Sequence, residues 1–356
     1  MGSYTMDLCL LAGSGHGELA KQALSWDSNT LSVPRIGYPV GLGALRSTRF
    51  SNGENCVTIE ASVRNADVFI IQTASTPVND MLMELLIAIN ACKIASARRI
   101  TAVLPCFPYS RQDKKDRSRA PITAKLVANI LESAGCNHVI CVDFSKTMDL
   151  HASQIQGFFN IPVDKCTASL FSEKTMVEYI RQNYGTDDLV VVSPDAGGAK
   201  RAASIADRLH VDLALIHKER KVANQVSRMI LVGNVSDKVA VLVDDIADTC
   251  GTLAMAATIL KQHGASSCVA VVTHGFLSGP SVKVIEESNI DRLVVSNTLP
   301  LPEHAQSCSK IYQMDVSITI AEAIRRTHNG ESSYAVFRLS VTFGRPREVY
   351  IREALD

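Results

Sequence analysis

Short apolar runs rich in β-branched residues alternate along the chain with segments of helical periodicity. The runs predict strands at residues 68–72, 100–104, 189–192, 212–217, 239–243 and 268–273. The helical pattern predicts helices at residues 79–95, 121–134, 199–209 and about 319–327, and one that runs from 253 to near 264. This alternation is typical of βαβ units, so the expected fold class is α/β, with mostly parallel sheets flanked by helices.

Two of the predicted helices carry clear signals. The apolar side chains of the first recur at helical spacing and form one face, made of Met81, Leu82, Leu85, Leu86 and Ile89. The second is predicted to have Pro121 in its first turn and Gly135 as its stop, which is the usual asymmetry of helix ends.

The repeated pattern indicates two α/β lobes, and the length of 356 residues suits two domains. The predicted division is 1–165 for an N-terminal lobe, 166–318 for a C-terminal lobe, 319–337 for a helix and strand that pack back on the first lobe, and 338–356 for an extra tail. No low-complexity linker separates the lobes, so we expect a firm interface between them.

Composition limits the classes of partner. Lys plus Arg and Asp plus Glu each total 36, so the formal net charge is zero. The overall electrostatic field therefore does not favour nucleic acid or membrane, and any site for an anion must come from a local cluster of charge. The ten cysteines form no C-x-x-C pair and are expected to be reduced thiols. The N-terminus has no basic region of a signal peptide, and no apolar run approaches the ~20 residues that span a bilayer, so a cytoplasmic protein is expected.

The most specific motif follows the predicted strand at 239–243. Asp244 and Asp245 come first, then Asp248 and a small-residue loop, Thr249-Cys250-Gly251-Thr252, before a helix predicted to begin at Leu253. A parallel strand delivers such carboxylates to its carboxyl end, where they can accept hydrogen bonds from vicinal ribose hydroxyls. The loop and the helix N-terminus can hold a 5-phosphate. A plain capped helix would need only one of these carboxylates, so the string favours a phosphorylated-sugar site.

A second motif, residues 193–201, runs from a strand into a helix and contains Asp195, Gly197 and Gly198. The adjacent glycines permit close approach of backbone to a ligand, although by themselves they also suit an ordinary turn. Lys200 and Arg201 stand in the first helical turn, where the helix dipole does not favour cations. A bound pyrophosphate would explain them.

Two basic clusters also follow predicted strands. The first, at 217–221, includes Lys218 and Arg220; a cluster of this kind is usually a solvated loop, but its place at a strand end lets both cations clamp a phosphoryl group. The second, at 111–119, is rich in Arg and Lys and suits a triphosphate, with Arg111 able to bind phosphate oxygens in bidentate fashion. Its interleaved Asp113 and Asp116 argue against a nucleic-acid arm.

Two weaker patterns remain. Asp149 and His151 face the same way in an extended chain and could hold Mg²⁺ beside a nucleotide, although Mg²⁺ prefers oxygen ligands. The glycine-rich stretch at 13–17 resembles a dinucleotide loop, but its third glycine comes too early. We interpret it as a turn into the first helix.

Taken together, these strings resemble ribose-phosphate pyrophosphokinase over most of the chain. The matching segments are FSNGE from Phe50, NDMLMELL from Asn79, PCFPYSRQDKKDRSRAPITAKLVAN from Pro105, DLHASQIQGFF from Asp149, SPDAGGAKR from Ser193, HKERK from His217, VDDIADTCGT from Val243 and AEAIRRTHNGES from Ala321. A nucleobase phosphoribosyltransferase would share only the acidic motif.

The resemblance implies two phosphoribosyltransferase-like lobes with the active site between them. It also implies a reaction in which ATP and ribose 5-phosphate give phosphoribosyl pyrophosphate and AMP, with Mg²⁺ as the cofactor. Family members form hexamers built from dimers, and ADP and phosphate regulate many of them. No nucleic-acid or membrane partner is implied.

The resemblance also assigns residues. The ATP-binding set is Phe50, Asn52, Glu54, Arg111, Gln112, Asp113, Lys114, Lys115, Asp116 and His151, with the first three contacting adenine from a neighbouring subunit. The ribose-5-phosphate set is Asp195, Gly197, Gly198, Asp244, Asp245, Asp248, Thr249, Cys250, Gly251 and Thr252. Lys218, Arg220 and His151 are the implied catalytic residues, and Asp149, His151, Asp195 and Asp164 are the candidate metal ligands.

The chain departs from the family pattern in several places. Extra residues lie at 27–44 and at about 141–146, and the second insertion places Asp143 where the strand could end. Asn160 stands where many members have Asp, which leaves Asp164 as the acid that could support a metal site there. Because of these changes, a catalytically silent regulatory subunit of the same family remains an alternative. A phosphoribosyltransferase is a third interpretation, and it would not need the Arg111 segment.

Overall fold

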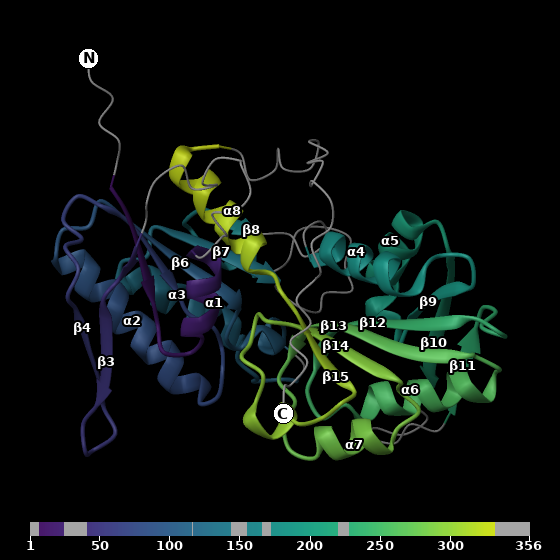
Figure 1. Ribbon diagram of the computed structural model, residues 1–356. Coiled ribbons are helices and arrows are strands. Elements are labelled where there is room, and N and C mark those ends of the chain that lie inside the picture. The colour runs from purple at the N-terminus through teal and green to yellow at the C-terminus, as the bar shows by residue number, and fades with distance from the viewer. Residues whose placement is uncertain are drawn as a thin grey trace.

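The computed structural model describes residues 7–24, 41–115, 117–143, 155–165, 172–219 and 228–331. These residues build two α/β lobes, each around its own sheet, and Figure 1 shows the two sheets side by side. The expected fold class is confirmed. In this described part, no helix is both long and apolar enough to cross a membrane.

The first sheet has six parallel strands. In spatial order they are β2 (Leu42–Gly43), β1 (Leu8–Ala12), β5 (Asp67–Ile71), β6 (Arg99–Cys106), β7 (His138–Asp143) and β8 (Val163–Lys165). A separate antiparallel hairpin, β3 (Leu45–Arg49) and β4 (Asn55–Ile59), lies beside α2. The central strands are buried on both faces, as parallel strands covered by helices must be.

Helices cover both faces of this sheet. One face packs against α2 (Val78–Ile94) and α3 (Thr123–Ala134). The other packs against α1 (Gly17–Leu24) and α8 (Ser317–Asn329). The chain therefore returns after the second sheet to complete the core of the first lobe, and Figure 1 shows α8 reaching across from β15.

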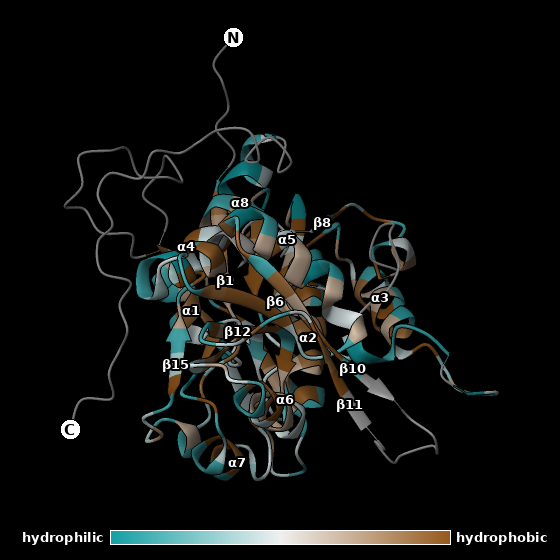
Figure 2. Cartoon of the chain, turned by 90° about the vertical axis from the view of Figure 1, so that its right-hand side faces the viewer, coloured by the Kyte–Doolittle hydropathy of each residue, from teal (hydrophilic) through white to brown (hydrophobic). Residues whose placement is uncertain are grey.

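The second sheet has seven strands. In order they are β11 (Arg228–Val232), β10 (Asp212–Glu219), β9 (Leu189–Ser193), β12 (Val239–Ala247), β13 (Ser267–Gly275), β14 (Arg292–Ser296) and β15 (Ile311–Met314). All pair in parallel except the edge strand β11, which is antiparallel to β10. Hydrophobic strands such as β12 lie at the centre of the molecule in Figure 2.

The second sheet is also covered on both faces. The helices α4 (Ser172–Tyr184) and α5 (Ala199–Leu209) pack on one face, and α6 (Gly251–Gln262) and α7 (Ser281–Glu287) pack on the other. Four 3₁₀ turns complete the described elements, at Ser110–Gln112, Gln156–Phe158, Ala196–Gly198 and Glu303–Ala305. The lobe boundary predicted at 165/166 falls against residues outside the described part and stays a prediction.

The predicted elements are present, but three bounds were wrong. The strand predicted at 239–243 continues to Ala247, so the acidic pair lies on the strand and not after it. The next helix begins at Gly251 and not at Leu253. The helix predicted from Pro121 begins at Thr123, so Pro121 precedes the helix, whereas Gly135 does end it in a left-handed conformation with φ 117°.

Three predicted features fall wholly or largely outside the described residues. These are the extra segment at 27–44, of which only 41–44 are described, the strand expected before residue 337, and the tail at 338–356.

Candidate active site

The carboxyl ends of the two sheets face one another, because side chains that follow strands of each sheet touch across the lobes. Arg111, after β6, forms an ion pair with Asp248, after β12, at 2.7 Å between Nη1 and Oδ2. Ala74, Cys106 and Leu299 form a buried apolar cluster that also joins the two lobes. Ligands of open α/β sheets bind outside the carboxyl ends of strands, so this junction is the candidate active site.

The acidic pair is held deep in the site by β12. Asp244 is 8% exposed and Asp245 is 1% exposed, and the Asp245 amide donates to Asp244 Oδ1 at 2.9 Å. Burial, followed by hydrogen bonding to Asp245 and the charge of that carboxylate, raises the pKa of Asp244 to about 8. The positive charge of Arg201, whose Nη1 lies 4.0 Å from Asp245 Oδ1, opposes this shift. The pair therefore holds a proton near neutral pH unless a cation or hydrogen-bond donor stabilises its full charge.

The predicted phosphate loop is a short connection between β12 and α6. The segment that follows β13 supports it, because the Ala247 and Asp248 carbonyls accept hydrogen bonds from the amides of Leu277 and Ser278, each at 3.0 Å. Cys250 takes a left-handed conformation with φ 61°, and α6 begins directly after it. This geometry places the N-terminus of α6 at the loop, where backbone amides and the helix dipole favour an anion.

Cys250 does not add reactive chemistry to this loop. Burial, with a smaller contribution from the charge of Asp248, raises the pKa of its thiol to about 12. A thiol that stays protonated at neutral pH is a poor nucleophile and a poor metal ligand.

The glycine loop after β9 is a tight 3₁₀ turn. Asp195 Oδ1 accepts a hydrogen bond from the Gly198 amide at 3.0 Å, and Ser193 Oγ donates to the Asp195 carbonyl at 2.7 Å. A Cβ at Gly198 would lie 2.8 Å from Ser193 Oγ, so only glycine fits without a shift. Gly197 is exposed at the tip of the turn. The contact with Ser193 therefore explains Gly198, and the expected close approach of this backbone to a ligand stays a prediction.

The basic cluster at 111–119, expected to bind ATP, belongs to the loop that follows β6. Tyr109 is left-handed, with φ 59°, and precedes a 3₁₀ turn that presents Arg111 toward Asp248. The Gln112 side chain accepts a hydrogen bond from Thr123 Oγ1 at 2.5 Å, which ties the loop to α3. Asp113 is buried, whereas Lys114 and Lys115 are exposed. Asp116 lies outside the described residues.

The β3–β4 hairpin presents its tip to solvent. Phe50 is 58% exposed, Asn52 Oδ1 accepts from the Glu54 amide at 3.1 Å, and Gly53 supplies the positive φ of 91°. The base of the hairpin is fixed to α2, where Arg49 pairs with Asp80 at 2.5 Å. No described residue of the other lobe forms a hydrogen bond or ion pair with these three side chains, so the structure does not bring them to the interlobe site.

The glycine-rich stretch at 13–17 is a turn into α1, as interpreted from the sequence. The Gly15 amide donates to Gln72 Oε1 at 2.9 Å, and the Ser14 amide donates to Glu84 Oε1 at 2.6 Å. A Cβ at Gly15 would lie 2.4 Å from Gln72 Oε1. The glycines therefore allow close packing against two buried polar side chains, and no ligand is needed to explain them.

The remaining predicted site residues are only partly placed. Asp149, His151 and Arg220 lie outside the described residues, and of Lys218 only the backbone, within β10, is described. Asp164 lies in β8, where it contacts His138 Nε2 at 3.0 Å and accepts from Thr327 Oγ1 at 3.2 Å. These contacts attach Asp164 to β7 and α8. Among the described residues, no group of three or more His, Cys, Asp or Glu side chains could hold a metal ion.

Sequence analysis missed several polar residues at the lobe junction. They stand just beyond or at the carboxyl ends of β5, β13 and β14, and they are Gln72, Thr73, His274, Ser296 and Thr298. The only available signal was their position, since each ends an apolar run. No motif marks them, because their partners are distant in the sequence.

Comparisons with known proteins agree with this architecture. The N-terminal domain of ribose phosphate pyrophosphokinase matches residues 8–135, and the phosphoribosyl synthetase-associated domain matches residues 221–338. Ribose-phosphate pyrophosphokinase 2 of Schizosaccharomyces pombe is 56% identical over 333 residues, covering 93% of this chain and 97% of that protein. The crystal structure of phosphoribosylpyrophosphate synthetase from Mycobacterium smegmatis is 39% identical, with a TM-score of 0.79, and covers 91% of this chain and 99% of the other.

Proposed function

The chain belongs to the ribose-phosphate pyrophosphokinase family, and we propose that it transfers the β,γ-diphosphoryl group of ATP to the anomeric hydroxyl of ribose 5-phosphate. The products are phosphoribosyl pyrophosphate and AMP. The observation that carries this proposal is the 2.7 Å contact between Arg111 and Asp248. It sets the loop expected to bind the triphosphate directly against the loop expected to bind the sugar phosphate.

The sugar binds on the second lobe. Asp244 and Asp245 accept hydrogen bonds from the two vicinal ribose hydroxyls, and their burial makes these bonds strong. The 5-phosphate lies in the loop of Asp248, Thr249, Cys250, Gly251 and Thr252, at the N-terminus of α6. This arrangement directs the anomeric carbon away from the phosphate loop.

The transferred group lies between the lobes. The turn of Asp195, Gly197 and Gly198 receives the diphosphoryl oxygens through its backbone. Lys218 and Arg220 stabilise the charge that develops as the group moves, and His151 lies at the triphosphate. Positioning and charge neutralisation do most of the work in such reactions.

ATP binds on the first lobe. Arg111 and Gln112 contact the nucleotide, with Asp113, Lys114, Lys115 and Asp116 completing the segment. Phe50, Asn52 and Glu54 stack on and bind adenine in the site of a neighbouring subunit. Support for a shared site comes from the exposure of Phe50 at the tip of a hairpin held rigidly at its base.

In the reaction, the anomeric oxygen forms a bond to the β-phosphorus and loses its proton. The bond between the β-phosphorus and the bridging oxygen on the α-phosphate breaks, so AMP leaves with that oxygen. The two lobes must therefore hold ATP and the sugar in a fixed relative position, because the attacking oxygen, the phosphorus and the leaving oxygen lie roughly on one line.

Magnesium fits the donor chemistry of the site as an ion held mainly by ATP. The described residues offer carboxylates but no ready cluster of three ligands, and Mg²⁺ usually keeps waters and substrate phosphates in its shell. Asp149 and His151, with Asp195, would hold it on the protein side. Bound there, Mg²⁺ supplies positive charge to the triphosphate. Asp164 is a weaker candidate, because its described contacts are to His138 and Thr327.

The proposal extends to assembly, regulation and location. A homo-oligomer follows from the shared adenine site, and hexamers of dimers, with ADP and phosphate as regulators, are the family pattern. A cytoplasmic location suits buried thiols such as Cys92 and Cys268, whose pKa values burial raises to about 12.

The proposed reaction is tested by resolving adenine nucleotides after incubation with Mg²⁺, ATP, ribose 5-phosphate and inorganic phosphate. AMP that forms only when the sugar is present supports diphosphoryl transfer. ADP would indicate ordinary phosphoryl transfer. Folded protein that gives neither nucleotide would favour the regulatory-subunit alternative.

A further inference from the structure

A buried hydrogen-bonded chain joins the carboxyl ends of the two sheets outside the segments assigned to ligands. Thr73, just after β5, donates from Oγ1 to the Thr298 carbonyl at 2.7 Å and accepts from the Cys106 amide at 3.2 Å. Thr73 is 1% exposed and Thr298 is 0% exposed. One hydroxyl thus connects two strand ends of the first lobe to the second lobe in a place that water does not reach.

The acceptor in the second lobe is itself held in place. His274 Nδ1 lies 2.8 Å from Thr298 Oγ1, and Ser296 Oγ donates to the Thr273 carbonyl at 2.6 Å. The register between β13 and β14 shifts at this point, between Val272 and His274. A bulge of this kind re-aims backbone groups, and here the Thr273 carbonyl accepts from both hydroxyls, with Thr298 Oγ1 at 3.3 Å.

The chain connects the two halves of the proposed reaction. Cys106 is the last residue of β6, and the loop with Arg111 follows it. His274 lies beside Ile246 of β12, the strand that carries the acidic pair. Movement of Thr298 relative to Cys106 would therefore move the sugar-binding strand relative to the triphosphate loop.

We propose that Thr73 is a positioning residue for diphosphoryl transfer, whose hydroxyl sets the placement of the ATP-binding loop relative to the ribose-binding strand. This inference rests on the proposed function. Other interlobe contacts constrain the ATP-binding loop less: the Arg111–Asp248 pair is exposed, with side-chain exposures of 57% and 30%, and the cluster of Ala74, Cys106 and Leu299 is apolar. The hydrogen bond from Asn297 Nδ2 to Gln22 Oε1, at 3.0 Å, attaches the second lobe to α1 and not to β6 or the loop after it. A buried, satisfied hydroxyl fixes distance and direction together.

The test replaces the hydroxyl without changing the volume of the side chain. Thr73→Val should lower kcat by about 10- to 100-fold, because small misplacements of reacting groups cost that much, while each KM changes by no more than about threefold. Thr73→Ser, which keeps the hydroxyl, should restore kcat to within about threefold of wild type. If Thr73→Val does not fold, Thr73→Cys, with its weaker donor, should give an intermediate loss of kcat.

Thr101→Val is the matched control. Thr101 is a fully buried threonine of β6, in the same lobe, and its Oγ1 has no hydrogen-bond partner among the described residues. The same change of shape and polarity there should leave kcat unaltered. A wild-type kcat in Thr73→Val, an equal loss in Thr101→Val, or a loss confined to KM would overturn the proposal.

Hydrogen exchange separates this inference from the proposed function. Without any substrate, Thr73→Val should speed exchange of the Cys106 amide, and Thr101→Val should not. Wild-type protein that makes no AMP would refute the reaction, while protection of the Cys106 amide would still report on the contact. Faster exchange with an unchanged kcat would refute the positioning role alone.

Discussion

At the residue scale, the candidate site concentrates negative charge where the sugar is proposed to bind. Asp244 and Asp245 are adjacent and buried, and Arg201 Nη1 lies 4.0 Å from Asp245 Oδ1. Such a pair destabilises the folded chain when both groups are ionised and becomes useful when a ligand donates hydrogen bonds to it. Function and stability therefore make opposite demands on this strand.

The first prediction follows from the raised pKa of Asp244. Folding shifts this pKa from 3.8 to about 8, so the folded chain binds the proton more tightly than the unfolded chain does. Stability from this group is fully present at low pH and is lost as pH rises toward 8. Asp244→Asn should therefore raise the Tm relative to wild type more at pH 9 than at pH 5, as measured by calorimetry. Exposed Asp187→Asn is the control, and an equal gain at both pH values would contradict the argument.

The second prediction concerns the Arg111–Asp248 pair. Asp248→Asn removes the charge that engages Arg111, so a non-hydrolysable ATP analogue should bind more tightly when no sugar is present. For an exposed pair the gain is on the order of 0.5 kcal/mol, or about twofold in affinity. Titration calorimetry at low and high salt measures it, and the gain should shrink with salt. Asp212→Asn, which breaks a pair with Lys238 elsewhere, should have no effect; weaker ATP binding by Asp248→Asn would refute the idea.

At the element scale, most of the fold was predictable because parallel strands read as continuous apolar runs. The strands at 68–72, 100–104 and 268–273 were each located to within a few residues. The acidic pair was misplaced beyond its strand, because the backbone ladder of β12 continues through charged residues to Ala247. A hydropathy pattern places the end of a strand where polar residues begin. The backbone hydrogen bonds that define the strand can continue through those residues.

The site was predictable only where it is built from contiguous motifs. The loops at 195–198 and 248–252 could be found from their spacing alone. The polar junction of Thr73 with Thr298 could not, because it joins residues that are 225 positions apart and depends on how two sheets meet. The role of Asp164 was also invisible, since His138 and Thr327 come from different elements.

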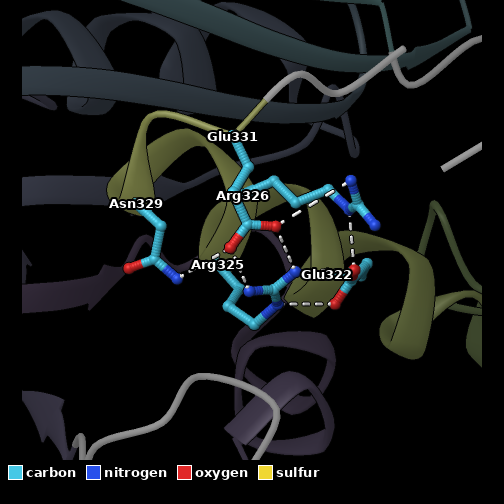
Figure 3. A network of polar contacts seen from close by, with 5 residues as sticks. All are labelled: Glu322, Arg325, Arg326, Asn329 and Glu331. Carbon is cyan, nitrogen blue, oxygen red and sulfur yellow. Dashed lines mark hydrogen bonds and ion pairs between the residues drawn. The ribbon is translucent and has the colours of Figure 1, made fainter. Parts of the chain in front are cut away.

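The helix α8 shows how one element can belong to a lobe that is distant in sequence. Its Ile320 and Ile324 are fully buried against the first sheet. At its C-terminal end, His328 Nδ1 lies 2.8 Å from buried Asp67, which also pairs with Arg99. Figure 3 shows how Arg325 and Arg326 bridge Glu322, within the helix, and Glu331, just after it.

The third prediction tests that assignment. Ile324→Ala should destabilise the first lobe by about 2–5 kcal/mol, because the substitution leaves a cavity under the first sheet. This is expected although Ile324 lies near the end of the described chain. Hydrogen exchange should rise in β1 and β5 before it rises in β9 and β12. Ile94→Ala, at a site 76% exposed, should change stability little. Loss of protection confined to the second sheet would show that α8 does not complete the first lobe.

At the scale of the whole molecule, the chain is two α/β lobes that meet at the carboxyl ends of their sheets. One lobe offers cations after β6, and the other offers carboxylates on β12 and an anion-binding helix end. The β3–β4 hairpin, proposed to bind adenine, lies beside α2, on the side of the first lobe away from the second sheet (Figure 1). We propose that a complete site includes the hairpin of a second copy of the chain.

The fourth prediction is complementation between two inactive variants. Phe50→Ala should lack the adenine contact, and Lys218→Ala should lack a cation of the transition state. Subunits of the two variants, dissociated and reassembled together, should regain activity, because a mixed pair contains one site with both residues intact. Each variant reassembled alone is the control. No recovery from verified mixed oligomers would place the hairpin in its own subunit's site.

The central claim is that the diphosphoryl group moves to the sugar as one unit, and tracing labelled phosphates tests it most directly. ATP labelled at the β-phosphate and ATP labelled at the γ-phosphate are used in separate reactions with Mg²⁺ and ribose 5-phosphate. The account predicts that both labels appear in the sugar product, each in step with the AMP formed. Transfer of the γ label alone, with ADP as the other product, would contradict it.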